Sequence, residues 1–360
     1  MKRALLSLLF ITFLVITKAQ IPDGYYSTAS GKTGAELKTA LYNIISKGTS
    51  VLGYGDLWTA FTTTDKKSDG KVWDMYSNCT FTFVTNQCGS TITNECSCYN
   101  REHSWPKSWF GGEILPMYTD MFHLVPTDGK VNGMRGNYPF GEVSNPTYTS
   151  GNGSKLGTCS FPGYTGIVFE PIDEYKGDFA RNYFYMATRY ENVISTWHSN
   201  DPNAEAILEP NSYPVFETWF INLLLKWNTS DPVSQKEIDR NNVIYTSYQH
   251  NRNPYIDHPE YVNSVWGVNV GITNVPAHVA LQVYPNPASS TCTITLPPNF
   301  NQQNDTFVVY SSTGTTVSAP LTFSGNNATL DLENLPSGFY LLRLAFNNYS
   351  TIYQARIIKK

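Results

Sequence analysis

A carboxylate and an imidazole stand side by side at Glu102 and His103, in a stretch that reads NREHSWPKSWFGG from Asn100 to Gly112. A glutamate can ligate a hard cation such as magnesium, and a neutral imidazole can take a proton from water. Because side chains alternate along a strand, the two can serve one centre only at a bulge or at a strand end, which Pro106 favours. On the residue types alone, a structural histidine is the more frequent role.

A second polar segment follows shortly after this pair. It runs from Asp120 to Val143 and reads DMFHLVPTDGKVNGMRGNYPFGEV, which is crowded with Asn, Arg, Asp, His and Gly. It lacks the apolar periodicity of a core helix or strand. The segment is therefore expected to make polar contacts, and this favours a functional interpretation of Glu102 and His103.

Four motifs occur in a fixed order along the chain: REHSWPKSWFGG, PMYTDMFHLVPTDGKVNGMRGNYPFGEV, FEPIDEYKGDFARNYFYMATRY and NRNPYIDHPEYV. Together they resemble the bacterial endonuclease I family of secreted, non-specific nucleases. The resemblance covers roughly Leu52 to Trp266. A single short motif would be weak evidence, whereas four in order are specific.

The resemblance implies a mixed α+β catalytic domain built around a ββα-metal (His-Me finger) unit. It implies that Glu102 and Asn132 ligate one divalent cation and that His103 is the general base. Mg²⁺ suits such oxygen ligands, with Mn²⁺ or Ca²⁺ as alternatives. Such a site would hydrolyse phosphodiester bonds and leave 5′-phosphate and 3′-hydroxyl ends.

A cationic side chain should also clamp the phosphate, because a guanidinium binds phosphate bidentately. Arg135 and Arg181 are both candidates, since each lies in a family-like motif. Some relatives place this arginine in a glycine-rich loop after the EH pair, but that loop here reads WFGGEILP without an arginine. Residues 177–190 show helical spacing, with Asp178 expected to start the helix. Arg181 would then be a buried member paired with Asp120, a phosphate or a carboxylate.

Other polar residues in these motifs have two interpretations each. Asp120 either orients a metal ligand or caps a turn, and His123 is expected to be a packed, hydrogen-bonded histidine. Lys107 and Lys130 would add to a local basic patch, which a nucleic-acid enzyme with a net charge of −4 requires. Arg252 lies among prolines and is expected to hold a closing loop, with direct contact to nucleic acid as the alternative.

The N-terminus has the form of a secretory signal peptide over residues 1–19. Lys2 and Arg3 precede an apolar run, and small residues come before the expected cut, which makes Gln20 the mature N-terminus. No later stretch approaches the roughly twenty apolar residues that a membrane span requires. We therefore expect a secreted protein without a stable membrane span.

Cysteine usage agrees with export to an oxidising compartment. A bridge between Cys88 and Cys98 would brace the strand that carries Glu102. Cys96 and Cys98 alone would make an incomplete zinc site. Five cysteines precede the C-terminal region, so one of them is free or pairs elsewhere: Cys79, Cys88, Cys96, Cys98 and Cys159.

The chain is expected to divide into a catalytic domain at 20–271, a linker at 272–280 and a small all-β sandwich at 281–360. Short alternating runs such as TCTITL, ATLDL and FYLLRLAF predict antiparallel strands in the last part. YPNPAS, LPSGFYLLRL and the final IIKK resemble the C-terminal sorting domain of type IX secretion substrates. This implies an export address that is removed after secretion, with an adhesive or carbohydrate-binding module as the alternative.

The expected substrate is DNA, with RNA as a second substrate, since contacts to phosphate and metal read no base sequence. The expected partners are nucleic acid and the type IX secretion machinery, and the expected state is a monomer. Another metal-dependent hydrolase is a rival, but the chain lacks an HExxH helix or a two-metal carboxylate cluster. A second rival is a non-catalytic surface-binding protein that retains the nuclease fold.

Overall fold

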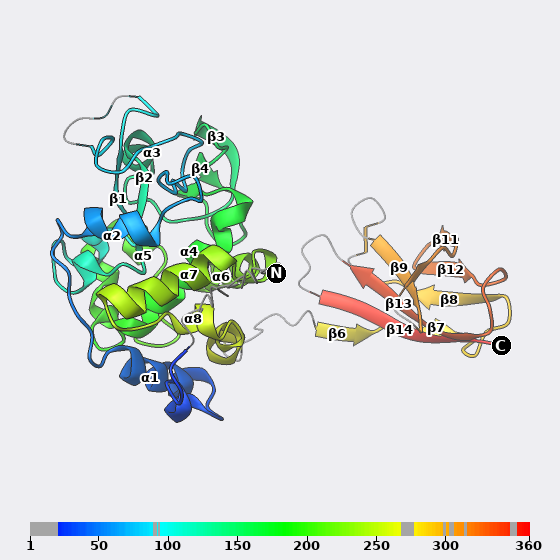
Figure 1. Cartoon of the computed structure of the whole chain (residues 1–360). Coiled ribbons are helices and arrows are strands. Elements are labelled where there is room, and N and C mark those ends of the chain that lie inside the picture. Colours follow the sequence, from blue (N-terminus) through cyan, green and yellow to red (C-terminus); the bar gives the residue numbers. More distant parts are fainter. Residues whose placement is uncertain are drawn as a thin grey trace, which may run out of the picture. The chain divides into compact units, whose positions relative to one another are not determined.

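The computed structural model describes residues 21–88, 92, 94–267, 277–297, 300–301, 306–312, 315–345 and 351–360. The chain forms two compact units, divided between Val270 and Gly271 (Figure 1). The signal peptide expected at residues 1–19 lies outside the described residues.

The N-terminal unit packs helices and short strands around an aromatic core. Buried Trp105 lies 4.9 Å from Tyr183 and 5.8 Å from Trp109 between ring centres. No helix in the described ranges is long and apolar enough to cross a membrane. The helices are α1 (Gly34–Ile45), α2 (Leu57–Thr64), α3 (Gly129–Arg135), α4 (Asp173–Arg189), α5 (Pro202–Glu205), α6 (Thr218–Ser230), α7 (Gln235–Val243), α8 (Pro254–Asp257) and α9 (Glu260–Val262). Short 3₁₀ and π turns are η1 (Ser27–Ala29), η2 (Lys107–Phe110), η3 (Met117–Thr119), η4 (Ile194–Thr196), η5 (His198–Asn200), η6 (Ile244–Tyr248) and η7 (Asn263–Gly267).

Helix α4 is the central helix of this unit. All of its residues from Gly177 to Thr188 are buried, as expected for a helix that is covered on every side. It begins at Asp173, so the start expected at Asp178 is wrong. Acidic residues in its true first turn stabilise the helix dipole, whereas Asp178 lies within the helix and accepts a hydrogen bond from Lys236 at 2.7 Å.

Strands β1 (Tyr99–His103) and β2 (Leu124–Asp128) form an antiparallel pair, and α3 follows β2 directly. The register is continuous, with Glu102 opposite Val125, and β1 ends at His103. Asp128 caps α3 by accepting hydrogen bonds from the backbone amides of its first turn. Two strands and a helix thus follow one another around the EH pair, which lies at a strand end.

Two disulfides tie the segment before β1 into a compact loop. Cys88 pairs with Cys98, the bridge considered from the sequence, and Cys79 pairs with Cys96. The backbone amide of Cys88 donates to the carbonyl of Tyr99 at 2.9 Å, so this loop runs beside β1. The bridges therefore brace the strand that carries Glu102 and His103.

The remaining thiols and the glycine that follows β2 fit this arrangement. Cys159 is buried and free, as is Cys292 in the C-terminal unit. A Cβ at Gly129 would lie 2.6 Å from the Cys88 sulfur, so only glycine admits this close approach. Cys79, Cys96 and Asp128 cluster closely, but the disulfide removes both sulfurs from use as metal ligands.

Three further strands form a separate small sheet in the order β3-β4-β5. They are β3 (Val143–Thr149), β4 (Lys155–Cys159) and β5 (Ile167–Glu170), and all pairs are antiparallel. Helix α4 follows β5 and packs against α6 (Figure 1). Its side chains Phe179 and Tyr183 contact Phe140, which lies just before β3.

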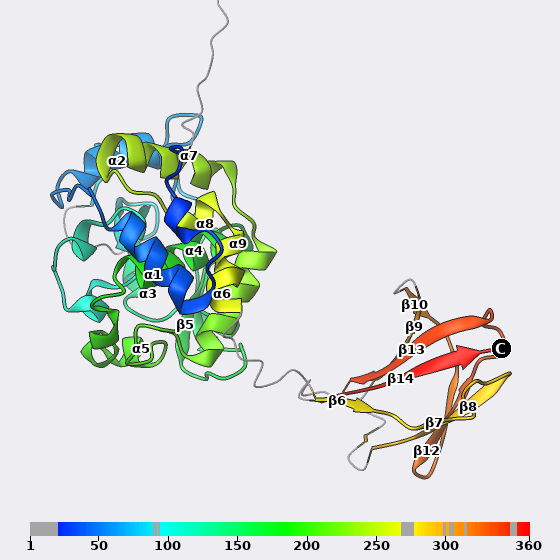
Figure 2. The same cartoon turned by 90° about the horizontal axis from the view of Figure 1, so that it is seen from below.

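The C-terminal unit is a sandwich of two sheets over one apolar core (Figure 2). The sheet orders are β10-β9-β13-β14-β6 and β11-β12-β8-β7, antiparallel except for β14 with β6. Strand β6 lies inside the segment expected to be a linker. The strands are β6 (Ala277–Ala280), β7 (Val283–Tyr284), β8 (Thr291–Thr295), β9 (Thr306–Ser311), β10 (Thr316–Val317), β11 (Leu321–Ser324), β12 (Asn327–Asp331), β13 (Gly338–Ala345) and β14 (Thr351–Lys359).

Candidate active site

His103 lies at the end of β1 with its imidazole fixed in one orientation. Its Nε2 is 3.0 Å from the carbonyl oxygen of Tyr118, and its ring stacks on the Tyr118 ring at 5.2 Å. A carbonyl oxygen can only accept, so Nε2 carries the proton and Nδ1 keeps the lone pair. Burial, with His123 nearby, lowers the pKa of His103 to about 3. The imidazole is therefore neutral at pH 7, and its Nδ1 accepts no hydrogen bond from a described residue.

Glu102 points to the other side of β1 and is nearly fully buried. Its Oε1 accepts hydrogen bonds from the Tyr76 hydroxyl and from Nη1 of Arg135, each at 2.9 Å. Burial raises the pKa of Glu102, and the charge of Arg135 opposes this shift. The second carboxylate oxygen accepts no hydrogen bond from the described residues, so it is available to a ligand.

Asn132 on α3 lies beside the same strand. Its Nδ2 donates to Oδ1 of Asn100 at 2.6 Å, and Asn100 and Glu102 share one face of β1 because they are two residues apart. Its amide oxygen accepts no hydrogen bond from the described part of the chain. A free carboxylate oxygen and a free amide oxygen at one strand–helix interface fit the donor set of a hard divalent cation.

Arg135 holds this interface together and has no exposed surface. Its guanidinium donates to Glu102 and to the backbone carbonyls of His103 and Ser104 at 2.6 to 2.9 Å. It therefore fixes the end of β1 from inside the fold. This placement does not fit the expected role of Arg135 as a phosphate clamp, and it makes Arg135 a positioning residue for Glu102.

Arg181 is also fully buried and has a carboxylate partner. Its Nε and Nη2 bind the two oxygens of Glu237 at 2.5 and 2.8 Å, and Nη1 donates to Asn228 and to the carbonyl of Asp231. Of the three partners expected for Arg181, the structure shows a carboxylate. Its role as a phosphate clamp does not fit this placement either.

We predict that Arg181→Met destabilises the protein and leaves substrate binding unchanged in the folded fraction. The substitution strands Glu237 as an unpaired buried charge, which costs about 3–5 kcal/mol of unfolding free energy. Urea unfolding measures this loss, and KM for nucleic acid below the unfolding transition measures binding. A KM raised tenfold with normal stability would instead restore Arg181 as a phosphate ligand.

Asp120 and His123 lie in the interior and do not reach Glu102 or Asn132 through any hydrogen bond within the described chain. Asp120 caps a turn at the Phe122 amide and also accepts hydrogen bonds from the hydroxyls of Tyr185 and Tyr190. His123 is fully buried, with Nε2 2.7 Å from the carbonyl of Met117. These contacts favour the turn-capping interpretation of Asp120 and the packed-histidine interpretation of His123.

The remaining expected cations differ in how free they are. Lys107 is about half exposed, with its side chain 48% accessible, and pairs with Glu113 at 2.8 Å. Lys130 on α3 is partly buried, and its Nζ forms no ion pair with a described residue. Arg252 is buried and forms a bidentate pair with Asp257 at 2.6 and 2.7 Å, which favours the loop-holding interpretation.

The sequence motifs did not identify Arg101 and Tyr54, which lie on the same side of β1 as His103. Arg101 lies two residues before His103, and alternation alone could have placed both on one face. Its guanidinium stacks on Tyr54, whose ring stacks in turn on Tyr118 at 4.4 Å and faces His103 at 6.0 Å. No motif marks Tyr54, which lies almost fifty residues away in the sequence, so only the fold brings it here.

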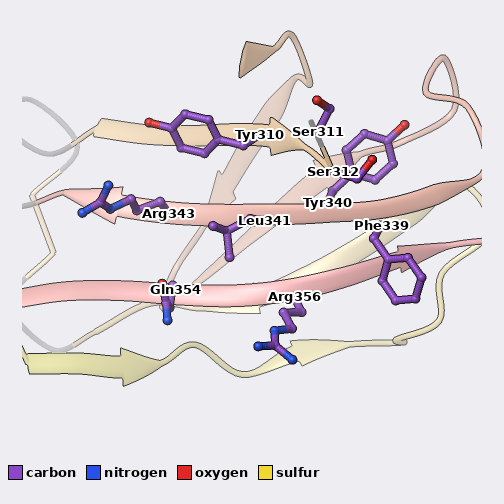
Figure 3. A pocket seen from close by; sticks show the side chains of 9 residues that line it. All are labelled: Tyr310, Ser311, Ser312, Phe339, Tyr340, Leu341, Arg343, Gln354 and Arg356. Atoms are coloured by element: carbon purple, nitrogen blue, oxygen red, sulfur yellow. The ribbon is translucent and has the colours of Figure 1, made fainter. Parts of the chain in front are cut away.

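A groove in the C-terminal unit lies far from this chemistry along the chain. It has a volume of about 810 Å³ and is open to solvent on the sheet of β9, β13 and β14 (Figure 3). Its lining combines aromatic, aliphatic and two arginine side chains: Tyr310, Ser311, Ser312, Phe339, Tyr340, Leu341, Arg343, Gln354 and Arg356. It holds neither a carboxylate nor an imidazole, so it is not a hydrolytic site of the kind at His103.

Comparison with known proteins agrees with this division. The Endonuclease I family model matches residues 33–260, and the secretion system C-terminal sorting domain matches residues 282–360. The extracellular ribonuclease of Bacillus amyloliquefaciens is 39% identical over 70% of this chain and 81% of its own length. That of Bacillus subtilis (strain 168) is 38% identical over 68% and 78%. Endonuclease-1 of Buchnera aphidicola subsp. Baizongia pistaciae is 27% identical over 48% and 67%.

A braced strand pair with a fixed imidazole, followed by an export domain, defines this protein as a secreted nuclease. The chain belongs to the endonuclease I family. Its C-terminal unit is a type IX sorting domain. The resemblance described from the four motifs is thereby confirmed.

Proposed function

We propose that this protein is a sequence-non-specific endonuclease that hydrolyses DNA, and RNA as a second substrate, with one divalent cation. The observation that carries the proposal is the neutral imidazole of His103, whose Nε2 donates to Tyr118 and whose Nδ1 accepts no hydrogen bond within the described ranges. Glu102 precedes it in the sequence and points to the other side of β1, and one of its carboxylate oxygens accepts no hydrogen bond from the described residues. These groups are the base and the anionic metal ligand that a ββα-metal site needs.

His103 would take the proton of the attacking water at Nδ1 while Nε2 keeps its hydrogen bond to Tyr118. Arg135 and Tyr76 would hold Glu102 in its ionised form and in one orientation. Asn100 would orient the amide of Asn132 toward the same cation. When bound, Mg²⁺ at Glu102 and Asn132 would neutralise charge on a phosphate oxygen and on the leaving 3′ oxygen.

The choice of substrate rests on chemistry and on the names of relatives. The Bacillus relatives are named ribonucleases and the Buchnera relative an endonuclease, and the proposed site contacts the phosphodiester rather than the base. Such a site can act on either nucleic acid. We propose Mg²⁺ as the cation, with Mn²⁺ or Ca²⁺ able to replace it.

This reaction predicts the chemistry of the product ends. Water attacks phosphorus and the 3′ oxygen departs, so fragments should carry 5′-phosphate and 3′-hydroxyl groups. DNA ligase should therefore join blunted products of plasmid digestion without prior kinase treatment. Products that need a kinase before ligation would contradict the proposed direction of attack.

A non-catalytic protein that retains the nuclease fold is the alternative. It would bind nucleic acid and leave it intact whatever cation is supplied. The free Nδ1 of His103 and the free oxygen of Glu102 favour the enzyme, because a binding protein has no need of an unpartnered base.

A further inference from the structure

Arg101, in the N-terminal unit, is held rigidly and forms no ion pair with a described carboxylate. The Cζ of Arg101 lies 3.6 Å from the ring centre of Tyr54 and 4.3 Å from that of Trp58. Its Nη1 donates to the carbonyl of Tyr54 at 2.7 Å. The guanidinium is thus fixed by two aromatic rings and one hydrogen bond, which removes much of the entropy that a free arginine would lose on binding.

Four other arginines of this unit are each neutralised by a carboxylate, unlike Arg101. Each of them forms a buried ion pair with Asp or Glu: Arg135, Arg181, Arg240 and Arg252. Arg189 also forms no ion pair with a described residue, but its Nη1 and Nη2 already donate to Ser46 and Thr49. Arg101 forms no ion pair with any carboxylate in the described ranges, and its Nη2 forms no hydrogen bond there. Its positive charge is therefore not neutralised by a described carboxylate, and the N–H groups of Nη2 have no acceptor there. The side chain is partly accessible to solvent.

The position of Arg101 relates it to the proposed base. Arg101 and His103 lie on one face of β1, while Asn100 and Glu102 lie on the face toward α3. On the same side, Nζ of Lys107 lies 5.4 Å from the Tyr118 ring centre. A phosphate near His103 would therefore meet a fixed guanidinium that no carboxylate in the described part of the chain neutralises.

We propose that Arg101 is the arginine that binds a phosphate of the nucleic-acid backbone next to the scissile bond. This inference rests on the proposed function and assigns to Arg101 the role that burial denies to Arg135 and Arg181. The unused N–H groups of the Arg101 guanidinium supply donors for phosphate oxygens, and the rings of Tyr54 and Trp58 hold the guanidinium in place. It also explains how a chain with a net charge of −4 can attract a polyanion locally.

The test compares full-length Arg101→Gln and Arg101→Lys with wild type, using cleavage of a labelled single-stranded oligodeoxynucleotide at fixed Mg²⁺. Initial rates give kcat and KM at a series of KCl concentrations. Arg356→Gln, in the sorting domain, removes one arginine charge and serves as the matched control. Thermal unfolding of each variant reports the separate contribution of the stack with Tyr54.

We expect Arg101→Gln to lower kcat/KM by about tenfold or more and to flatten its dependence on salt by about 0.7 in log–log slope, as for one lost phosphate contact. Arg101→Lys should keep most of the slope while losing part of the rate, because it retains the charge but not the fork. Arg356→Gln should match wild type.

An unchanged salt slope in Arg101→Gln would overturn the inference, even with a lower melting temperature, because a purely structural role predicts that pattern. In that case wild type still cleaves and the proposed function stands. Wild type that fails to cleave at any Mg²⁺ concentration would overturn the proposed function and this inference together.

Discussion

Replacing His103 with alanine should reduce turnover by about 10²- to 10⁴-fold, the usual contribution of a general base. Nδ1 of His103 has no hydrogen-bond partner among the described residues and its Nε2 is held by Tyr118, so we expect the side chain to accept a proton rather than to bind phosphate. Binding of nucleic acid should therefore stay within about twofold of wild type. Single-turnover rates and equilibrium binding to a labelled oligonucleotide measure the two effects separately.

His258→Gln is the matched control for this experiment. His258 is partly exposed, its Nδ1 is 2.9 Å from Glu260, and its ring packs on Tyr261, away from the strand pair. This variant should retain full activity. Added imidazole should partly restore the rate of His103→Ala, since it can occupy the vacated space and supply a base. Near-normal hydrolysis by His103→Ala would rule out His103 as the base.

Replacing Glu102 with glutamine should have two separable effects. Loss of the charge leaves Arg135 as an unpaired buried cation, which lowers the unfolding free energy by about 3–5 kcal/mol. Loss of the anionic ligand should raise the Mg²⁺ concentration needed for half-maximal activity by about tenfold or more. Urea unfolding without metal measures the first effect, and Mg²⁺ titration of the cleavage rate measures the second.

Tyr76→Phe separates the metal effect from the stability effect. It removes the other hydrogen bond to the same oxygen of Glu102 but keeps the carboxylate charge. The expected stability loss is about 1 kcal/mol, with little change in the Mg²⁺ response. A normal Mg²⁺ response in Glu102→Gln, measured well below its unfolding transition, would exclude Glu102 as a metal ligand.

Local patterns predicted the elements of the site well. Alternation along a strand predicted that Glu102 and His103 point to opposite faces, and the structure shows this arrangement, with β1 ending at His103. The sequence left the disulfide connectivity open, and the structure shows the bridge between Cys88 and Cys98 that braces β1. Alternating runs in the last eighty residues predicted a β domain, because each strand there has one buried and one exposed face.

Long-range pairing accounts for what the sequence could not predict. The partner of Arg181 is Glu237, on a different helix, and no motif connects the two. The motifs left Asp120, a phosphate or a carboxylate as possible partners of Arg181, because a guanidinium suits phosphate and carboxylate equally well. Arg101 was overlooked for the converse reason, since only its contacts with Tyr54 and Trp58 show that its charge is fixed and unpaired.

The most direct test of the account is plasmid DNA cleavage by the full-length protein with Mg²⁺, with chelator, and with His103→Ala beside wild type on one gel. The account predicts Mg²⁺-dependent degradation to small fragments by wild type, and almost none with chelator or in the variant. RNA in a parallel lane should be degraded under the same conditions. A folded wild type that leaves both nucleic acids intact in Mg²⁺ and in Mn²⁺ would contradict the account and favour a binding protein with the nuclease fold.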